Sequence, residues 1–363
     1  MPKLSKKNEY DEKINCGYSR KGSKRSKGSK GSKKTTTKST SKKTLKTKQS
    51  AGSYVGHNPN IEKLNNEDQK CAPGVKFEQG TCFILEQLID MANAYNVWIL
   101  MKLVQNKDSI NVSNSKIDLL KQLTDRLRDT CDDQLCWIKQ SFMDYAVNRE
   151  QIVNETFRPT GPQGRFTWLN TTNINDVMTQ YHKKYKDFKF LGTVPLDFDK
   201  FPQLGFININ FNNLLNNGIK KIGAVFNLDY HFQSGSHWVA MYADLEQGNI
   251  YYFDSYGKPP EYEIKKFIKR IANWYIKKNK LNIEVENTET FMINANKKNN
   301  VENCEDMDVR YNTNRHQYKN SECGVYSMNF ILRLLKGETF NEINSQKLPD
   351  DDVNKCREVY FTY

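Results

Sequence analysis

Long apolar runs are missing from this sequence of 363 residues. None approaches the roughly 18 consecutive apolar residues that a helix needs to cross a bilayer. The amino-terminal stretch MPKLSKKNEYDEKINCGYSRKGSK also lacks the apolar core of a secretory signal. We therefore expect a protein that is not secreted and that does not associate with a membrane.

Acidic residues are absent from residues 19–48, which contain 13 Lys or Arg. The rest of the chain holds 42 basic and 42 acidic residues, so the net charge of +13 comes from this segment. Its Ser, Thr and Gly residues offer too little apolar surface to offset the entropy lost on folding. We expect a disordered tail that binds nucleic acid weakly, with an affinity that falls as salt rises. Packaging, nuclear entry and solubility alone explain such a tail equally well.

The short C-x-x-C spacing of a zinc knuckle is missing too. The eight cysteines are Cys16, Cys71, Cys82, Cys131, Cys136, Cys304, Cys323 and Cys356. Where glutathione keeps thiols reduced, cysteines serve as free thiols, metal ligands or catalytic groups sooner than as disulfides. The wide spacings argue against a metal, and we expect buried free thiols for the cysteines between residues 71 and 136.

Composition divides the chain into three parts. Residues 1–70 form the basic tail and a polar linker, and residues 71–152 form a helical region. Its predicted helices lie at 83–103, 115–130 and 134–147. The turn-forming segment GPQGRF follows soon after this region, and residues 153–363 form the third part.

The third part mixes helices with strands and is therefore α+β. Helices are predicted at 171–185 (capped by Thr171 or Thr172), 206–218, 259–280 and 321–337. Strands are predicted at 188–194, 220–228, 239–243, 250–253 and 289–295.

The hairpin formed by strands 239–243 and 250–253 carries two candidate site residues. His237 precedes its first strand and Asp254 follows its second, so the hairpin would bring both to one end of the sheet. There His237 can act as a base whose other ring nitrogen is oriented by Asp254. A lone His at this place usually caps a strand, so a catalytic role requires a nucleophile nearby.

Other residues compete for these roles, namely His231 and His316 for the base and Asp229 and Asp244 for the carboxylate. His231 lies in a polar loop, and His316 stands outside any predicted strand. Only Asp254 ends the return strand of the hairpin. The pattern therefore favours His237 with Asp254.

Cys323 supplies a nucleophile at the start of the predicted helix 321–337. A thiol in a first helical turn faces unpaired backbone N–H groups and the positive end of the helix dipole, which favour the thiolate. Gln317 stands six residues earlier. Its side-chain amide and the N–H of Cys323 could stabilise the oxyanion that forms when a thiolate attacks a carbonyl.

The segments HWV, FDSYG and Q followed by ECGVY resemble the catalytic signature of the ubiquitin-like-protein-specific cysteine proteases and of the adenovirus-type proteases (adenain). TWLNTTNI is similar to the segment that opens the SUMO-protease fold, and LPDDDVNKCREVYF to the segment that closes it. The resemblance covers residues 160–361. Two further segments resemble the thiol proteases of mimivirus-like and asfarvirus-like giant DNA viruses, namely CAPGVKFEQGTCFILEQL and ETFRPTGPQGRFTWLNTTNIN.

This resemblance implies a papain-like or adenain-like fold, in which helices flank a central mixed sheet, with an additional N-terminal helical region. It implies a thiol peptidase without a metal or organic cofactor. Trp168 and Trp238 match two tryptophans that line a narrow tunnel for a Gly-Gly backbone in SUMO proteases. Cleavage after Gly-Gly or Gly-X would follow. Glu322 departs from the Asp that usually precedes the nucleophile, which concerns its fine positioning.

The leading hypothesis is a cysteine endopeptidase that matures viral structural precursor proteins, acting in the virion or in factories in the host cytoplasm. Its partners would be protein substrates with Gly-rich cleavage sites. The same chemistry also suits an isopeptidase that removes SUMO or ubiquitin-like modifiers from host proteins. Effector-type acetyltransferases use similar catalytic residues but lack the Gly-Gly tunnel. A purely structural nucleic-acid-binding protein would leave the four catalytic residue types unexplained.

Overall fold

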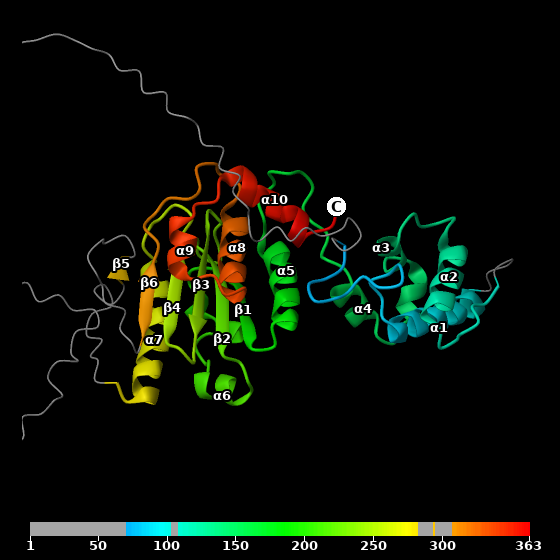
Figure 1. Ribbon diagram of the computed structural model, residues 1–363, viewed down its shortest axis with the longest axis horizontal. Coiled ribbons are helices and arrows are strands. Elements are labelled where there is room, and N and C mark those ends of the chain that lie inside the picture. The colour runs from blue at the N-terminus through cyan, green and yellow to red at the C-terminus, as the bar shows by residue number, and fades with distance from the viewer. Residues whose placement is uncertain (1–69, 103–107, 282–292, 295–306) are drawn as a thin grey trace, which may run out of the picture.

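The structure, a computed structural model, describes residues 70–102, 108–281 and 307–363, together with the backbone of residues 293–294 (Figure 1). The predicted tail and linker therefore lie outside the described residues up to residue 69, as do Cys16 and Cys304. Among the helices that are described, none is both long enough and apolar enough to cross a membrane.

A six-stranded mixed sheet lies at the centre of the larger part of the molecule, in the order β1-β2-β3-β4-β6-β5. Strand β3 runs antiparallel to both β2 and β4, whereas β1 runs parallel to β2, and β6 runs parallel to β4 and β5. The strands are β1 (Phe188–Val194), β2 (Lys221–Asn227), β3 (Trp238–Asp244), β4 (Asn249–Phe253), β5 (Ile293–Asn294) and β6 (Asp308–Tyr311). The predicted strands, including the hairpin, are confirmed, although most of the one predicted at 289–295 lies outside the described residues.

Both faces of the sheet are buried, because successive residues of β3 enter different cores. Ala240 and Tyr242 join the core on one face, and Val239 and Met241 join the core on the other. This arrangement explains why the strand sequences are continuously apolar. One face is covered by α5 (Thr171–Lys184), α8 (Cys323–Leu335), α9 (Phe340–Ser345) and α10 (Asp350–Tyr360), and the other by α6 (Phe211–Asn216) and α7 (Tyr262–Asn279) (Figure 1).

Helices α5 and α6 differ from the prediction in cap or length, and α7 and α8 begin slightly after the predicted residues 259 and 321. Helix α5 is capped by Asn170 instead of Thr171 or Thr172, because Asn170 and Asn173 each accept the other's backbone N–H in a reciprocal pair of hydrogen bonds. Helix α6 is shorter than the predicted 206–218, since Asn210 caps it and two 3₁₀ turns precede it. These turns are η2 (Phe198–Lys200) and η3 (Pro202–Leu204).

The N-terminal helices enclose a core of their own, which extends from Cys71 to Phe157. The predicted helix at 134–147 is divided, because Asp133 caps a single short helix before Gln140 adopts an extended conformation. Gln180 of α5 donates hydrogen bonds to two carbonyls of this region, which joins it to the sheet-containing part. The elements are α1 (Leu85–Lys102), α2 (Lys116–Leu127), α3 (Gln134–Trp137), η1 (Ser141–Tyr145) and α4 (Arg149–Glu155).

The prediction of free thiols in this region is wrong, since Cys71 is bonded to Cys82 and Cys131 to Cys136. Their Cα atoms lie 5.4 and 5.5 Å apart, which suits a disulfide. The prediction relied on the redox state of the compartment, whereas the turns before α1 and α3 decide which thiols meet. Among the described cysteines, Cys323 and Cys356 take no part in a disulfide, and both are buried.

The Cys71–Cys82 bond closes a loop with a sequence separation of 11 residues. A closed loop of this length restricts the unfolded chain by about 3 kcal/mol. Replacing both cysteines by Ala should therefore lower the free energy of unfolding of the helical region by about 2–3 kcal/mol, measured by urea denaturation without reductant. An unchanged free energy, together with alkylation of both wild-type thiols in urea without reductant, would contradict this disulfide.

Candidate active site

His237 and Asp254 meet at the end of the sheet where β3 begins and β4 ends. His237 Nε2 lies 2.6 Å from Asp254 Oδ1, and the two residues are 8% and 0% exposed. The carboxylate also accepts the backbone N–H groups of Tyr256 and Lys258. The Asn312 side chain is hydrogen bonded to the backbone N–H and C=O of Asp254. Asp254 is therefore held firmly enough to orient the imidazole.

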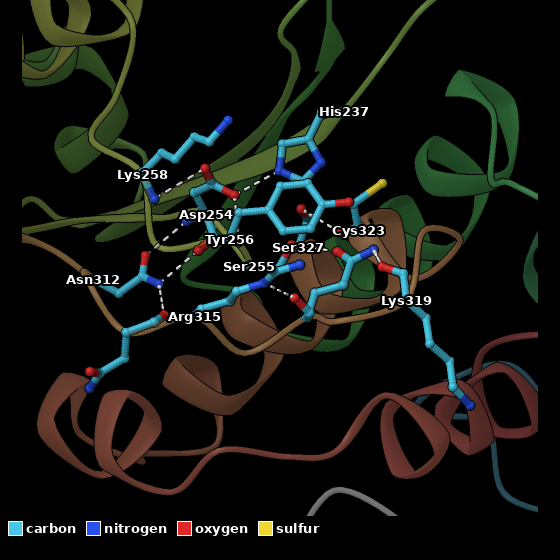
Figure 2. A network of polar contacts seen from close by, with 12 residues as sticks. His237, Asp254, Ser255, Tyr256, Lys258, Asn312, Arg315, Lys319, Cys323 and Ser327 are labelled. Atoms are coloured by element: carbon cyan, nitrogen blue, oxygen red, sulfur yellow. Dashed lines mark hydrogen bonds and ion pairs between the residues drawn. The ribbon is translucent and has the colours of Figure 1, made fainter.

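Cys323 lies on the other side of the imidazole. It is the first residue of α8 and is 3% exposed. Figure 2 shows the His237 ring with one nitrogen directed at Asp254 and the Cys323 sulfur on its opposite side. One turn later, Ser327 donates its hydroxyl to the Cys323 carbonyl at 2.9 Å. The order carboxylate, imidazole, thiol is the one that nucleophilic catalysis by cysteine requires.

The surroundings of His237 decide its charge. Burial lowers the pKa of the imidazole, because it disfavours the charged form. Hydrogen bonds to Asp254 and Cys323, and the negative charges of both groups, outweigh burial and raise the pKa of His237 to about 9. The ring also stacks on Tyr256, with centroids 4.5 Å apart. At neutral pH, His237 is thus an imidazolium that can stabilise a thiolate and later release a proton.

Gln317 is fully buried, and its side-chain amide is fixed at both ends. Oε1 accepts the Ser255 hydroxyl at 2.6 Å, and Nε2 donates to the Lys319 carbonyl at 2.7 Å. The backbone N–H groups of His316 and Gln317 both donate to the Ser255 carbonyl, which ties this loop to the end of β4. An amide nitrogen carries two hydrogens, so Nε2 keeps one that it can donate to an oxyanion.

Glu322 immediately precedes Cys323 and is fully buried. Its carboxylate forms an ion pair with buried Arg357 of α10, with Nε and Oε2 3.3 Å apart. It also accepts hydrogen bonds from the Ser321 hydroxyl and from Asn354 Nδ2. Asn354 in turn exchanges two hydrogen bonds with Arg165. The Glu at this position therefore links the start of α8 to α10 and to the segment that leads to Trp168.

Trp168 and Trp238 line a cleft of about 450 Å³ that reaches His237. Trp238 is buried and donates its indole N–H to the Leu169 carbonyl at 2.8 Å. Trp168 is 46% exposed. A Cβ atom at Gly324 would lie 3.1 Å from Leu169 Cβ and 3.3 Å from Trp238 Cδ1, so a larger residue there would push this wall back by a few tenths of an ångström.

The competing residues are engaged elsewhere. His231 lies on the wall of the cleft, and its Nδ1 is 2.8 Å from Asp197 Oδ2. Burial, together with Lys347 and Arg333, lowers the pKa of His316 to about 4 and keeps it neutral. The two competing carboxylates stabilise loops, since Asp229 accepts hydrogen bonds from Ser236 and Gly235 and Asp244 from the β3–β4 turn.

Three residues at the site were not singled out from the sequence. Ser255 and Tyr256 directly follow Asp254. The Ser255 hydroxyl orients Gln317, and the Tyr256 ring stacks on His237. Their proximity in FDSYG is a signal that could have identified them. Asn312 holds the Asp254 backbone from 58 residues away, and nothing local in the sequence indicates it.

Comparisons with known proteins show what the chain is similar to. The profile of the Ulp1 protease family, C-terminal catalytic domain, matches residues 219–362. A protein of Acanthamoeba polyphaga mimivirus, named as a thiol protease, is 38% identical over 295 residues, which cover 78% of this chain and 90% of that protein. The SUMO-1 cysteine protease of African swine fever virus (isolate Pig/Kenya/KEN-50/1950) is 22% identical over 277 residues, which cover 71% of this chain and 93% of that protein. A crystal structure of the protease of African swine fever virus superposes with a TM-score of 0.53 at 21% identity, covering 71% of this chain and 93% of that one. The resemblance to giant-virus thiol proteases and the predicted fold class are thus confirmed.

The environment of His237 predicts a specific pH dependence. The imidazole should titrate near pH 9 in the folded protein and near 6.5 in the unfolded chain. Because its pKa is raised, its contribution to stability is complete below about pH 6.5 and is lost as the pH rises through about 9. NMR titration of labelled histidine should show this midpoint, and Asp254→Asn should move it to lower pH. A wild-type midpoint at or below 6.5 would contradict the arrangement.

Proposed function

The chain belongs to the Ulp1 family of cysteine proteases, and we propose that it is an endopeptidase that cleaves proteins after Gly-Gly or Gly-X, with Cys323 as its nucleophile. The observation that supports this role is the buried series Asp254, His237 and Cys323, with a 2.6 Å contact between the first two. Each of the three residues has the chemical type and the neighbour that its role needs.

The reaction follows from the geometry. The Cys323 thiolate attacks the scissile carbonyl, and the resulting oxyanion accepts hydrogen bonds from Gln317 Nε2 and the backbone N–H of Cys323. The His237 imidazolium gives its proton to the leaving amine, and a thioester remains. Neutral His237 then takes a proton from water, whose oxygen attacks the thioester carbonyl. The C–S bond breaks, the carboxylic acid product leaves, and the Cys323 thiolate and the His237 imidazolium are restored. No step requires a metal or an organic cofactor.

Trp168 and Trp238 are proposed to select glycine. They line the cleft beside His237, and Gly324 lets the start of α8 approach Trp238. A passage between flat indole rings accommodates a peptide backbone but leaves little space for a Cβ atom. Substrates with Gly at the last two positions before the cut would therefore bind in the reactive geometry, and bulkier residues there would not.

We propose viral structural precursors as the substrates, because the matched relatives come from large DNA viruses. The protein would then act in the virion or in the host cytoplasm. The basic segment 19–48, outside the described residues, would add weak binding to nucleic acid. A second candidate is a deconjugating isopeptidase. It draws support from the name of the swine-fever relative, a SUMO-1 cysteine protease, and from the exposed side chains of Phe166 and Tyr318, which could contact a folded modifier.

A direct test compares wild type with Cys323→Ala on fluorogenic peptides that end in Gly-Gly and on SUMO and ubiquitin conjugates. The variant should lose peptide cleavage by more than about 1,000-fold, because the nucleophile is removed. Cys356→Ala is a matched control, since it removes the other buried cysteine that lies outside a disulfide in the described residues, in α10. Cleavage of conjugates alone would favour the isopeptidase, and activity in Cys323→Ala would exclude Cys323 as the nucleophile.

A second test addresses the tryptophans. Wild type should cleave Gly-Gly peptides about 10 to 200 times more efficiently than Ala-Gly peptides, the discrimination expected for one methyl group. Trp168→Ala should reduce this ratio below about tenfold, and its half-exposed side chain can be removed without disturbing a core. Phe166→Ala provides a nearby aromatic control. Equal rates for both peptides with wild-type protein would rule out the proposed tunnel.

A further inference from the structure

Asp350 is a buried carboxylate that the mechanism above does not use. It is 7% exposed and is the first residue of α10, where the helix dipole favours negative charge. Its Oδ2 accepts the backbone N–H groups of Tyr318 and Lys319, each at 2.9 Å. Its Oδ1 lies 3.1 Å from the hydroxyl of Tyr326. One side chain therefore contacts two segments that are separate in the chain.

The first segment is the oxyanion loop, residues 316–319, which carries Gln317. Gln317 Nε2 donates to the carbonyl of Lys319, whose N–H is held by Asp350. The position of the Lys319 backbone thus sets the direction of the amide, while Ser255 holds its other end. A shift of this loop would turn the second N–H of the amide away from the oxyanion.

The second segment is α8, which carries both Cys323 and Tyr326. The Tyr326 hydroxyl lies within hydrogen-bonding distance of the carbonyls of Leu348 and His316 and of Asp350, and its single hydrogen serves one of them at a time. Burial and the Asp350 carboxylate raise the pKa of Tyr326, so the hydroxyl stays protonated. Asp350 therefore lies between the two sources of oxyanion donors.

We propose that Asp350 is a positioning residue of the oxyanion hole, which fixes the oxyanion loop against α8 and thereby aims Gln317 Nε2 at the carbonyl that Cys323 attacks. This inference rests on the proposed function, since it takes Gln317 as an oxyanion donor. Asp350 contacts neither the substrate nor the reacting atoms. Its removal should weaken the transition state more than substrate binding, and so lower kcat while KM changes little.

Three variants of the full chain test this role on a Gly-Gly peptide. Gln317→Ala should lower kcat by about 100-fold or more, the cost of one oxyanion donor. Asp350→Ala should lower kcat at least about tenfold, because two backbone N–H groups lose their acceptor and the loop is released. Asp350→Asn should recover much of this loss, since its amide oxygen can still accept both N–H groups. Asp351→Ala is the matched control, because this exposed neighbour pairs with the Lys319 ammonium at 2.5 Å and should leave kcat unchanged.

Two further readouts separate positioning from a general effect on folding. The first readout uses a peptide aldehyde that ends in Gly-Gly. The Cys323 sulfur adds to its carbonyl carbon, the electron pair of the C=O bond moves to the oxygen, and the oxyanion hole stabilises this negatively charged oxygen. Dithiodipyridine instead exchanges with the thiolate, forming a mixed disulfide and releasing thiopyridone, and needs no hole. Asp350→Ala should bind the aldehyde at least about tenfold more weakly. Its labelling rate at Cys323, measured against Cys323→Ala, and its Tm should stay close to those of wild type.

The outcomes are distinct. Wild-type kcat in Asp350→Ala, together with a damaged Gln317→Ala, would overturn the positioning role and leave the proposed function standing. If kcat, labelling rate and Tm all fell together, and to the same extent in both Asp350 variants, Asp350 would be assigned to folding. This result would also overturn the positioning role. Wild-type activity in Gln317→Ala would overturn the oxyanion assignment itself, and the inference with it. Should Asp350→Ala not fold, the kcat and aldehyde affinity of Asp350→Asn, compared with Asp351→Ala, decide the question.

Discussion

The antiparallel pairing of β3 with β4 is the constraint on which the candidate site depends. Ala240 lies opposite Phe253, so the chain enters β3 at His237 and leaves β4 at Asp254 on the same end of the sheet. A slip of one residue would turn every side chain of a strand to the other face. Both faces are buried here, so a slip would place the residues of each core against the wrong neighbours. The packing of two cores thus fixes the distance between His237 and Asp254.

Burial at this end of the sheet has an electrostatic cost that a dense set of hydrogen bonds offsets. Asp254 is fully buried, yet its oxygens accept from the imidazole and from two backbone N–H groups. Glu322 is equally buried beside Cys323, where Arg357 and Asn354 satisfy its hydrogen-bonding capacity. Buried charges are tolerated when they are paired and hydrogen bonded in this way. The low-dielectric surroundings then strengthen the interaction between imidazole and thiol.

The parts of the molecule that local sequence governs could be predicted, and the parts that depend on distant contacts could not. Apolar runs identified β1 to β4, and the residues flanking the hairpin and the start of α8 identified His237, Asp254 and Cys323. The hydrogen bonds of Asn312 and Asp350 to the loops around the site span 58 and 31 to 32 residues and leave no local pattern. The disulfides do not follow from the cellular compartment, because the turns before α1 and α3 bring the paired thiols together. Helix α6 and the divided helix at 134–147 were predicted too long, since asparagine and aspartate caps begin new elements inside an apolar pattern.

The central claim is that His237, oriented by Asp254, activates Cys323 for attack on a substrate carbonyl. The most direct test is to treat the protein at neutral pH with a peptide ending in a Gly-Gly vinyl sulfone, to which a reactive thiolate adds, and to locate the adduct by mass spectrometry. We expect one adduct, at Cys323, and little or none under the same conditions in His237→Ala. Reaction at another residue, or equal labelling of Cys323 without His237, would contradict it.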